Sequence, residues 1–186
     1  MFKSVPDILR CLSAWDSFTF QKEGFDKEDA HAVSVYQTWL TNLSVKDTKN
    51  IFFSNPTTIH SNPLLRYCII HGKAMLQEMD KENETLVKNK GKKWKLKNGR
   101  RVISLEHYGA RSSEMFKSVK DVHQNGIVYR KVDGAYSISL YNLNEDDNFH
   151  CGEYLRDNYN GGGHQGAGGC TLSIEEMEKI FRNKRL

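Results

Sequence analysis

Apolar side chains recur at helical spacing through the first half of the chain. Val5, Ile8 and Leu12, for example, fall on one face of a helix. The same period predicts helices over residues 2–12, 29–43 and 63–89. We therefore expect a helical first half, whose last helix is long enough to connect two parts of the chain.

The second half changes to the shorter, alternating apolar runs that are typical of strands. Two dipeptides, Asn98-Gly99 and Asp133-Gly134, are two-residue hairpin signals. The strands that they connect are predicted at residues 93–97 and 100–105, and at residues 126–132 and 135–141. Two antiparallel hairpins are the expected result.

Helices are predicted between and after these hairpins. Their apolar spacing places them at residues 110–122, 151–159 and 174–181. Ser173 stands three residues before Glu176, the capping-box pattern of a helix start. This order predicts an α/β fold, in which an N-terminal helical segment and a long connecting helix precede a small mixed-sheet α/β domain. We place the two domains at residues 1–90 and 91–186.

The composition is typical of a globular, water-soluble protein. Of the 186 residues, 38% are hydrophobic and 27% are charged, and no apolar run is long enough to cross a bilayer. The start of the chain has no signal-peptide pattern. The four cysteines are widely separated and form no CxxC pair, so we expect reduced thiols and a cytoplasmic protein without a membrane partner.

One segment, Tyr159 to Cys170, holds six of the fourteen glycines and a histidine. Glycine has no Cβ, so an anionic or planar ligand can approach the main-chain N–H groups directly. His164 follows three consecutive glycines and can donate a hydrogen bond or carry a proton. The pattern indicates a ligand-binding loop, and a glycine turn needed only for folding is the competing interpretation.

This segment resembles the GGGHxxAAG signature of the DHH-associated domain. Gly161-Gly162-Gly163-His164 is followed by two residues and then by Ala167-Gly168-Gly169, with Gly168 where alanine is usual. That domain is the C-terminal, substrate-binding half of the DHH phosphoesterase superfamily. The order of the predicted elements resembles it over about residues 98–182, and the residues before them resemble the interdomain region of the same family.

The resemblance implies where a phosphate or nucleotide would bind. The residues that it points to are Gly161, Gly162, Gly163, His164 and Ala167. Strand alternation puts Ser139 and Tyr141 on the face opposite to Ile138 and Leu140, and the resemblance places that face at the ligand cleft. Arg130 is a further candidate for phosphate.

Positive charge is concentrated in one strip. Residues 88–101 hold eight Lys or Arg and no acidic residue, whereas the rest of the chain carries 19 basic and 23 acidic residues. Such a strip indicates nucleic-acid phosphate contacts, with Trp94 as a stacking platform. The candidate residues are Lys92, Lys93, Lys95, Arg100 and Arg101. The alternative is a solvated hairpin whose charges prevent edge-to-edge aggregation.

The chemistry of this family requires a divalent metal, usually manganese, held by aspartates and histidines in the catalytic half. The sequence contains no Asp-His-His and no His-x-Asp-x-Asp motif, so we assign no catalytic residue. Asp16 is the one position that matches an acidic residue near the family's metal centre, and a helix-ending aspartate is the competing interpretation. We expect no cofactor for the chain alone, and manganese only in an assembly with a catalytic half.

Three functions remain open. The first is a nucleotide- or oligonucleotide-phosphate-binding protein that is not catalytic alone. The second is a subunit of a split phosphodiesterase, which hydrolyses short oligonucleotides or cyclic dinucleotides with a separate catalytic DHH chain. The third is a protein-interaction inhibitor that reuses the fold. The expected partners are thus a nucleotide or short single-stranded nucleic acid, a catalytic partner chain or a host protein, and a second copy in a homodimer.

Overall fold

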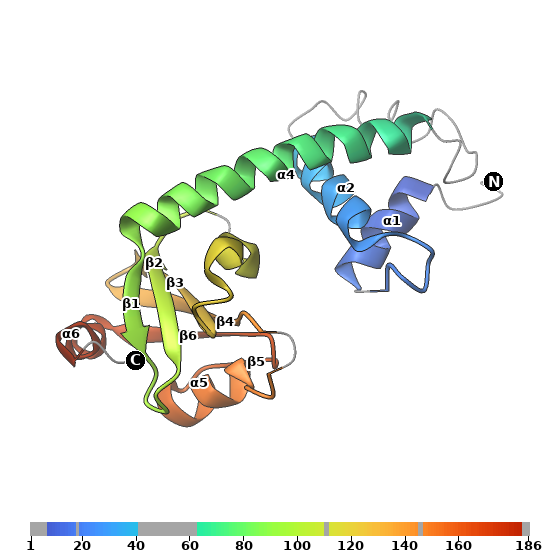
Figure 1. Cartoon of the computed structure of the whole chain (residues 1–186). Coiled ribbons are helices and arrows are strands. Elements are labelled where there is room, and N and C mark those ends of the chain that lie inside the picture. Colours follow the sequence, from blue (N-terminus) through green and yellow to red (C-terminus); the bar gives the residue numbers. More distant parts are fainter. Residues whose placement is uncertain (1–6, 18, 41–62, 110–111, 145–146, 184–186) are drawn as a thin grey trace. The chain divides into compact units, whose positions relative to one another are not determined.

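The computed structural model describes residues 7–17, 19–40, 63–109, 112–144 and 147–183 (Figure 1). By packing, the chain divides into two compact units, Met1–Met79 and Asp80–Leu186. The division falls within the long helix α4, Pro63–Lys90. The domain boundary expected after residue 90 stays a prediction.

The first unit is helical, as the apolar spacing predicts. Helices α1 (Asp7–Asp16) and α2 (Lys27–Leu40) pack with the first part of α4. Their shared core holds Ile8, Cys11, Ala14, Phe25, Ala30, Val33, Tyr36, Leu65 and Cys68. α1 continues past the predicted end at residue 12, and residues 2–6 and 41–43 of the predicted helices lie outside the described residues.

Helices α2 and α4 approach each other at a glycine. A Cβ added at Gly72 would collide with the backbone carbonyl of Ala32, so no side chain fits there unless a helix moves. Next to it in the chain, Lys73 forms an ion pair with Asp29 over 2.6 Å, and this hydrogen bond raises the pKa of Lys73.

The second unit is built on a six-stranded mixed sheet. Its strands are β1 (Lys92–Lys95), β2 (Arg101–Glu106), β3 (Asn125–Val132), β4 (Ala135–Asn142), β5 (Gly162–Gly163) and β6 (Ala167–Ser173). Their order in the sheet is β1-β2-β3-β4-β6-β5. β2 and β3 run parallel, and the other neighbouring strands pair antiparallel. The predicted α/β fold class is confirmed.

Both predicted hairpins are present. The first turn is one residue longer than the two-residue turn predicted. Lys95 pairs with Arg101, and the N–H of Leu96 donates to the Arg100 carbonyl over 3.0 Å, so residues 97–99 form the loop, with Gly99 at a φ of 85°. β3 and β4 are joined through Asp133-Gly134, whose φ angles are 49° and 80°. Two consecutive residues with positive φ give the type I′ turn, whose twist matches that of the two strands.

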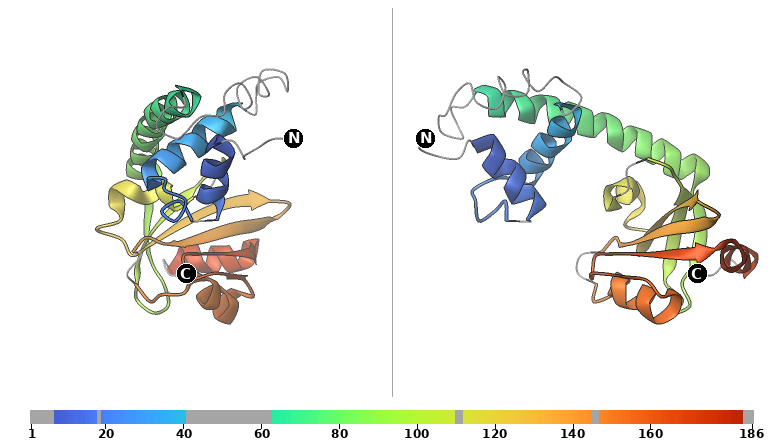
Figure 2. Two further views of the ribbon diagram at one scale, coloured as in Figure 1. Left: turned by 90° about the vertical axis from the view of Figure 1, so that its right-hand side faces the viewer. Right: turned by 180° about the vertical axis from the view of Figure 1, so that it is seen from behind.

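The two faces of the sheet carry separate apolar cores. The helical elements of this unit are η1 (Ser113–Val119), α5 (Cys151–Tyr159) and α6 (Ile174–Asn183). Figure 2 shows η1, in yellow, and α5, in orange, on opposite sides of the sheet. Ile138 and Leu140 pack in the core that includes α5 and α6, as predicted. Val128 and Tyr141 pack in the other core, with η1.

η1 is shorter and tighter than the helix predicted over residues 110–122. It is a 3-10 helix whose buried side chains are Met115 and Phe116. Val122, on the predicted apolar face, has 56% of its surface exposed. The apolar stripe that would support a longer α-helix therefore ends early. Residues 110 and 111 lie outside the described part of the chain.

The predicted capping box at the start of α6 is confirmed. The N–H of Glu176 donates to Ser173 Oγ over 3.2 Å, and the N–H of Ser173 donates to the carboxylate of Glu176 over 2.8 Å. The bond from the Ser173 N–H lowers the pKa of Glu176. Two N–H groups at the helix start are thereby satisfied.

The cysteines are buried free thiols. None of the four takes part in a disulfide, and burial raises the pKa of Cys151 to about 12. A separate finding concerns membranes: among the described residues, no helix has the length and hydropathy needed to span a bilayer.

Candidate functional site

The glycine-rich segment forms strands rather than an open loop. Both residues of β5 pair with β6, opposite Gly168 and Gly169. β6 begins within the segment, at Ala167. Because these glycines have no side chains, the backbones of β5 and β6 are open to close approach by a third element.

The first turn of α5 is that third element. A Cβ added at Gly152 would collide with the backbone carbonyl of Gly163, and one at Gly168 would lie 3.1 Å from the amide nitrogen of Gly152. Gly163 also has a φ of 141°, a conformation that L side chains rarely adopt. These glycines therefore provide contact between backbones.

Hydrogen bonds hold the same contact together. The N–H of Cys151 donates to the carbonyl of Gln165 over 3.1 Å. The N–H of Gly152 donates to the carbonyl of His164, also over 3.1 Å. His150, the N-cap residue, accepts a third N–H through Nδ1. The protein itself thus satisfies the first N–H groups of α5.

His164 is exposed, and its ring bends back over the turn. Nδ1 accepts the N–H of Gly166 over 3.2 Å, and the backbone N–H of His164 donates to the carbonyl of Ala167 over 2.8 Å. Because Nδ1 accepts this bond within the turn, Nε2 is the ring nitrogen that could meet a ligand.

Strand register brings several predicted residues to one face of the sheet. Arg130 of β3 stands opposite Ser137 of β4, which stands opposite Thr171 of β6. Two residues along, Ser139 stands opposite Gly169. Paired residues on neighbouring strands point to the same side of a sheet. These groups therefore share a face.

A groove of about 600 Å³ opens at these residues. It is lined by Ser137, Ile138, Ser139, Tyr159, Asn160, Gly161, Gly169, Cys170 and Thr171. The hydroxyl and amide side chains among them can both donate and accept hydrogen bonds. Asn160 ends α5 in the left-handed conformation, with a φ of 51°. The groove is therefore polar. Of its two glycines, Gly161 packs against Gly169 and Leu155, whereas the main chain at Gly169 is open.

Arg130 supplies positive charge one strand away from Ser137. Its Nε is buried and has no hydrogen-bond partner in the described part of the chain. A buried, unsatisfied donor costs on the order of 1–3 kcal/mol. An anion bound at this end of the sheet would offset that cost.

The other predicted binding residues lie at the opposite end of β4 and β6. Tyr141 is 9% exposed, and its ring centroid lies 6.4 Å from that of Phe116 in the core beneath η1. Ala167 stands opposite Tyr141 and packs against the same core. At about 3.3 Å per residue, Tyr141 lies roughly 13 Å along the strand from Ser137. His164, which bonds to Ala167, belongs to this far end.

The basic strip is divided between two faces. Lys93, Lys95 and Arg101 share the face of the η1 core, because Lys93 pairs with a residue of that core and Lys95 pairs with Arg101. Lys92 alternates to the other face, together with Trp94. Trp94 is only 8% exposed. The prediction that Trp94 is a stacking platform for bases is therefore wrong, because strand alternation turns its ring into the core.

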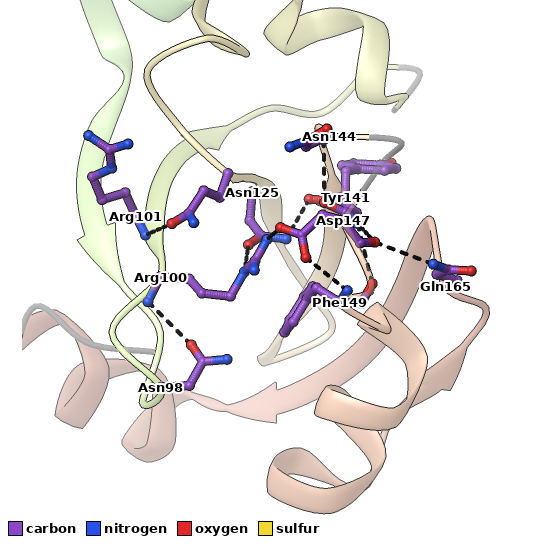
Figure 3. Close-up of polar contacts among 11 residues, drawn as sticks. Asn98, Arg100, Arg101, Asn125, Tyr141, Asn144, Asp147, Phe149 and Gln165 are labelled. Carbon is purple, nitrogen blue, oxygen red and sulfur yellow. Dashed lines mark hydrogen bonds and ion pairs between the residues drawn. The ribbon is translucent and has the colours of Figure 1, made fainter.

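Arg100 is an internal cation (Figure 3). Its guanidinium forms an ion pair with Asp147 and donates through Nε to Asn125 Oδ1 over 2.8 Å. The same group lies 4.3 Å from the ring centroid of Phe149. The side chains of Arg100 and Asp147 are only 15% and 21% exposed, and the hydrogen bond lowers the pKa of Asp147.

The segment of Asp147 also contacts the glycine turn, as Figure 3 shows. The side-chain amides of Gln165 and Asn142 donate to the Asp147 carbonyl, each over 3.3 Å. The backbone N–H of Asn142 donates to the carbonyl of Gly166 over 2.9 Å. A network that begins at Arg100 thus holds the turn that carries His164.

The candidate metal residue stands apart from these groups in the sequence. Asp16 is exposed at the last position of α1. Within the described residues, no three His, Cys, Asp or Glu side chains lie close enough together to hold a metal ion. Manganese in an assembly with a catalytic half stays a prediction.

Three residues of the site were not singled out from the sequence. Gly152 had a signal, because a glycine inside a predicted helix costs about 1 kcal/mol and needs a packing reason. Asn160, ahead of three glycines, fits a left-handed helix end. Thr171 becomes recognisable only through strand register, which depends on pairing distant segments.

Comparison with known proteins places the fold. No protein-family model matches the chain, and no curated protein matches it. Among solved structures, the chain is similar to a pGpG-specific phosphodiesterase from Vibrio cholerae, with a TM-score of 0.53 and 14% identity over 95% of this chain. It is also similar to a structure described as the DHH domain of a member of the s1p family of ribosomal proteins, with a TM-score of 0.53 and 13% identity over 87% of this chain.

These similarities bear on the fold alone. The chain spans 64% of the first protein and 42% of the second. It therefore shares a fold with part of each of these two larger proteins, the second of which is described as a DHH domain. At this level, the resemblance that was predicted from the glycine-rich segment is confirmed.

Two glycine substitutions should show which glycines are needed for backbone packing. Gly152→Ala should lower the free energy of unfolding by about 1–3 kcal/mol, because its Cβ meets the Gly163 carbonyl. Gly162→Ala, the matched control, should change it little, because nothing lies within 4 Å of the added Cβ. Urea unfolding followed by circular dichroism measures both. Equal effects of the two substitutions would contradict the packing described for α5.

Removing the partly buried carboxylate of Asp147 should change the acid dependence of stability. Because the folded pKa of Asp147 is lowered, its contribution is complete above about pH 4 and disappears as the pH falls through the folded pKa. Asp147→Asn should therefore cost about 1–3 kcal/mol at pH 7 and much less at pH 2. Denaturant titrations at both pH values measure the difference. An equal loss of unfolding free energy at both pH values would show that the charge of Asp147 does not stabilise the fold through Arg100.

Proposed function

We propose that the chain binds a nucleotide or a short oligonucleotide through its phosphate and does not hydrolyse it alone. The observation that carries the proposal is the groove of about 600 Å³ between β4, β6 and the end of α5. There the hydroxyls of Ser139 and Thr171 lie beside the open main chain of Gly169.

Each part of this end of the sheet has a role in the proposed complex. The hydroxyl groups and the amide of Asn160 donate to phosphate oxygens. Arg130 adds the positive charge and a planar set of N–H donors suited to a phosphate. Gly169 lets the ligand approach the backbone closely. Nε2 of His164 contacts a more distant part of a longer ligand.

Two similarities support the ligand class. The glycine segment resembles the substrate-binding half of DHH phosphoesterases, and one structural neighbour is described as a pGpG-specific phosphodiesterase. Both are consistent with a ligand in which phosphates are joined to nucleosides.

Substitutions in the groove should weaken nucleotide binding without unfolding the protein. Arg130→Gln should reduce the affinity for AMP or linear pGpG about 10- to 100-fold, because a hydrogen bond to a charged group contributes about 1.5–3 kcal/mol. Gly169→Val should block the groove, because the new side chain would fill space that the ligand needs. The fold should tolerate it, because its Cβ would meet only the Ile138 carbonyl, at 3.4 Å. Isothermal titration calorimetry measures both affinities.

The neighbouring residue provides the control. Lys131 is exposed and alternates to the other side of β3, so Lys131→Gln should bind AMP as the unmodified chain does. If Arg130→Gln and Gly169→Val also bind normally, the groove is not the site. If the unmodified chain binds no nucleotide, the proposal fails and the same surface becomes a candidate for binding a protein.

A second function is that of one subunit of a split phosphodiesterase. The observation that favours it is the resemblance of the glycine-rich segment to the substrate-binding half of DHH phosphoesterases, without the Asp-His-His motif of the catalytic half. In this case a separate chain with an Asp-His-His motif would hold manganese, and this chain would hold the substrate.

The split-enzyme function has a direct test. Mixing the chain with a separately purified chain that carries the Asp-His-His motif should give manganese-dependent hydrolysis of pGpG that neither shows alone. Arg130→Gln should raise the KM of the mixture more than it lowers kcat, because it removes a binding contact. Equal hydrolysis by the catalytic chain without its partner would rule this function out.

A further inference from the structure

A patch of positive charge lies on the β1–β2 ladder, outside the groove. Lys95 and Arg101 are cross-strand partners, and Lys93 stands two residues along on the same face. Within the described residues, none of the three forms an ion pair. Like charges directly opposite each other in a sheet are destabilising. An anion bound over the patch would reduce this repulsion.

A buried histidine lies beside these cations. His123 is 7% exposed, and its Nδ1 has no hydrogen-bond partner in the part of the chain that the structure describes. Burial lowers the pKa of His123, and the charges of Lys93 and Arg101 lower it further. An anion bound over the two cations would reduce their repulsion and the positive potential at the ring.

A chain of hydrogen bonds relates this patch to the glycine turn. Gln124 donates its N–H to the Arg101 carbonyl over 3.1 Å, and Leu143 donates to the Gln124 carbonyl over 3.0 Å. Asn142 then donates to the Gly166 carbonyl over 2.9 Å. These links cross from β2 to the β5–β6 turn, three strand spacings or roughly 14 Å. The patch and the turn therefore lie at the same end of the sheet.

We infer that Lys93, Lys95 and Arg101 form a second anion subsite, which binds backbone phosphates of a single-stranded nucleic acid whose terminal nucleotide occupies the groove. This inference rests on the proposed function. A mononucleotide cannot reach both places, whereas a strand of several nucleotides can run from the groove past His164 to the patch. The chain thus favours oligonucleotides over mononucleotides, through charge and without reading bases.

The experiment compares two ligands with one double variant. AMP and an oligoadenylate of about six nucleotides are titrated into the unmodified chain and into Lys95→Gln/Arg101→Gln. The variant should bind the oligoadenylate about tenfold more weakly at low salt and bind AMP unchanged. Its slope of log affinity against log salt should be smaller by about 1.4, the value for two phosphate contacts on a single strand.

A matched variant controls for net charge. Lys81→Gln/Lys179→Gln removes two exposed lysines from α4 and α6 and should leave the affinity and the salt slope unchanged. Equal oligoadenylate binding by both variants would overturn the second subsite while leaving the groove intact. Loss of AMP binding in Lys95→Gln/Arg101→Gln would also overturn it, because the patch would then belong to the groove. Absence of AMP binding by the unmodified chain counts against the proposed function instead.

Discussion

The contact between the first turn of α5 and the β5–β6 strands determines where the groove lies. Because Gly152, Gly163 and Gly168 present no side chains, the helix rests on the backbones of both strands. The start of α5 is therefore fixed, and a helix of nine residues transmits that position to its other end. Asn160 and Gly161, which follow the helix, line the groove. Most of these glycines support the candidate site through packing. Gly169 differs, because only the Ile138 carbonyl would lie within 4 Å of an added Cβ, so it leaves room for a ligand at the groove.

Two adjacent arginines show how the fold sorts its charges. Arg100 lies before β2 and turns into the structure, where Asp147 and Asn125 neutralise and orient it. Arg101 begins β2 and stays exposed beside Lys95. A run of basic residues in a sequence can thus contain both cations paired inside the structure and exposed cations that can bind a ligand. Only the pairing of strands separates the two kinds.

Local signals in the sequence were sufficient for most of the elements. Asp133-Gly134 determines its two-residue turn through two positive φ angles, and Ser173 with Glu176 determines a helix start through two hydrogen bonds. Asn98-Gly99 marked the place of the other turn but not its length, because only Gly99 has a positive φ. The site was less predictable, because it depends on contacts between distant segments. Alternation correctly put Tyr141 on the face opposite Ile138, but it could not show that η1 covers that ring. For the same reason Ser139 was found by its face, whereas Thr171 needed the register of β6.

The parallel pairing of β2 and β3 has a consequence for how this unit folds. The β3–β4 hairpin closes through a two-residue turn and can form early, because little chain entropy is lost. β2 reaches its place beside β3 only after the chain has passed through η1, so this pairing closes a longer loop. Arg100 meets Asp147 only when both steps are complete. We therefore expect the partly buried ion pair between Arg100 and Asp147 to form late, after the β3–β4 hairpin on which the groove is built.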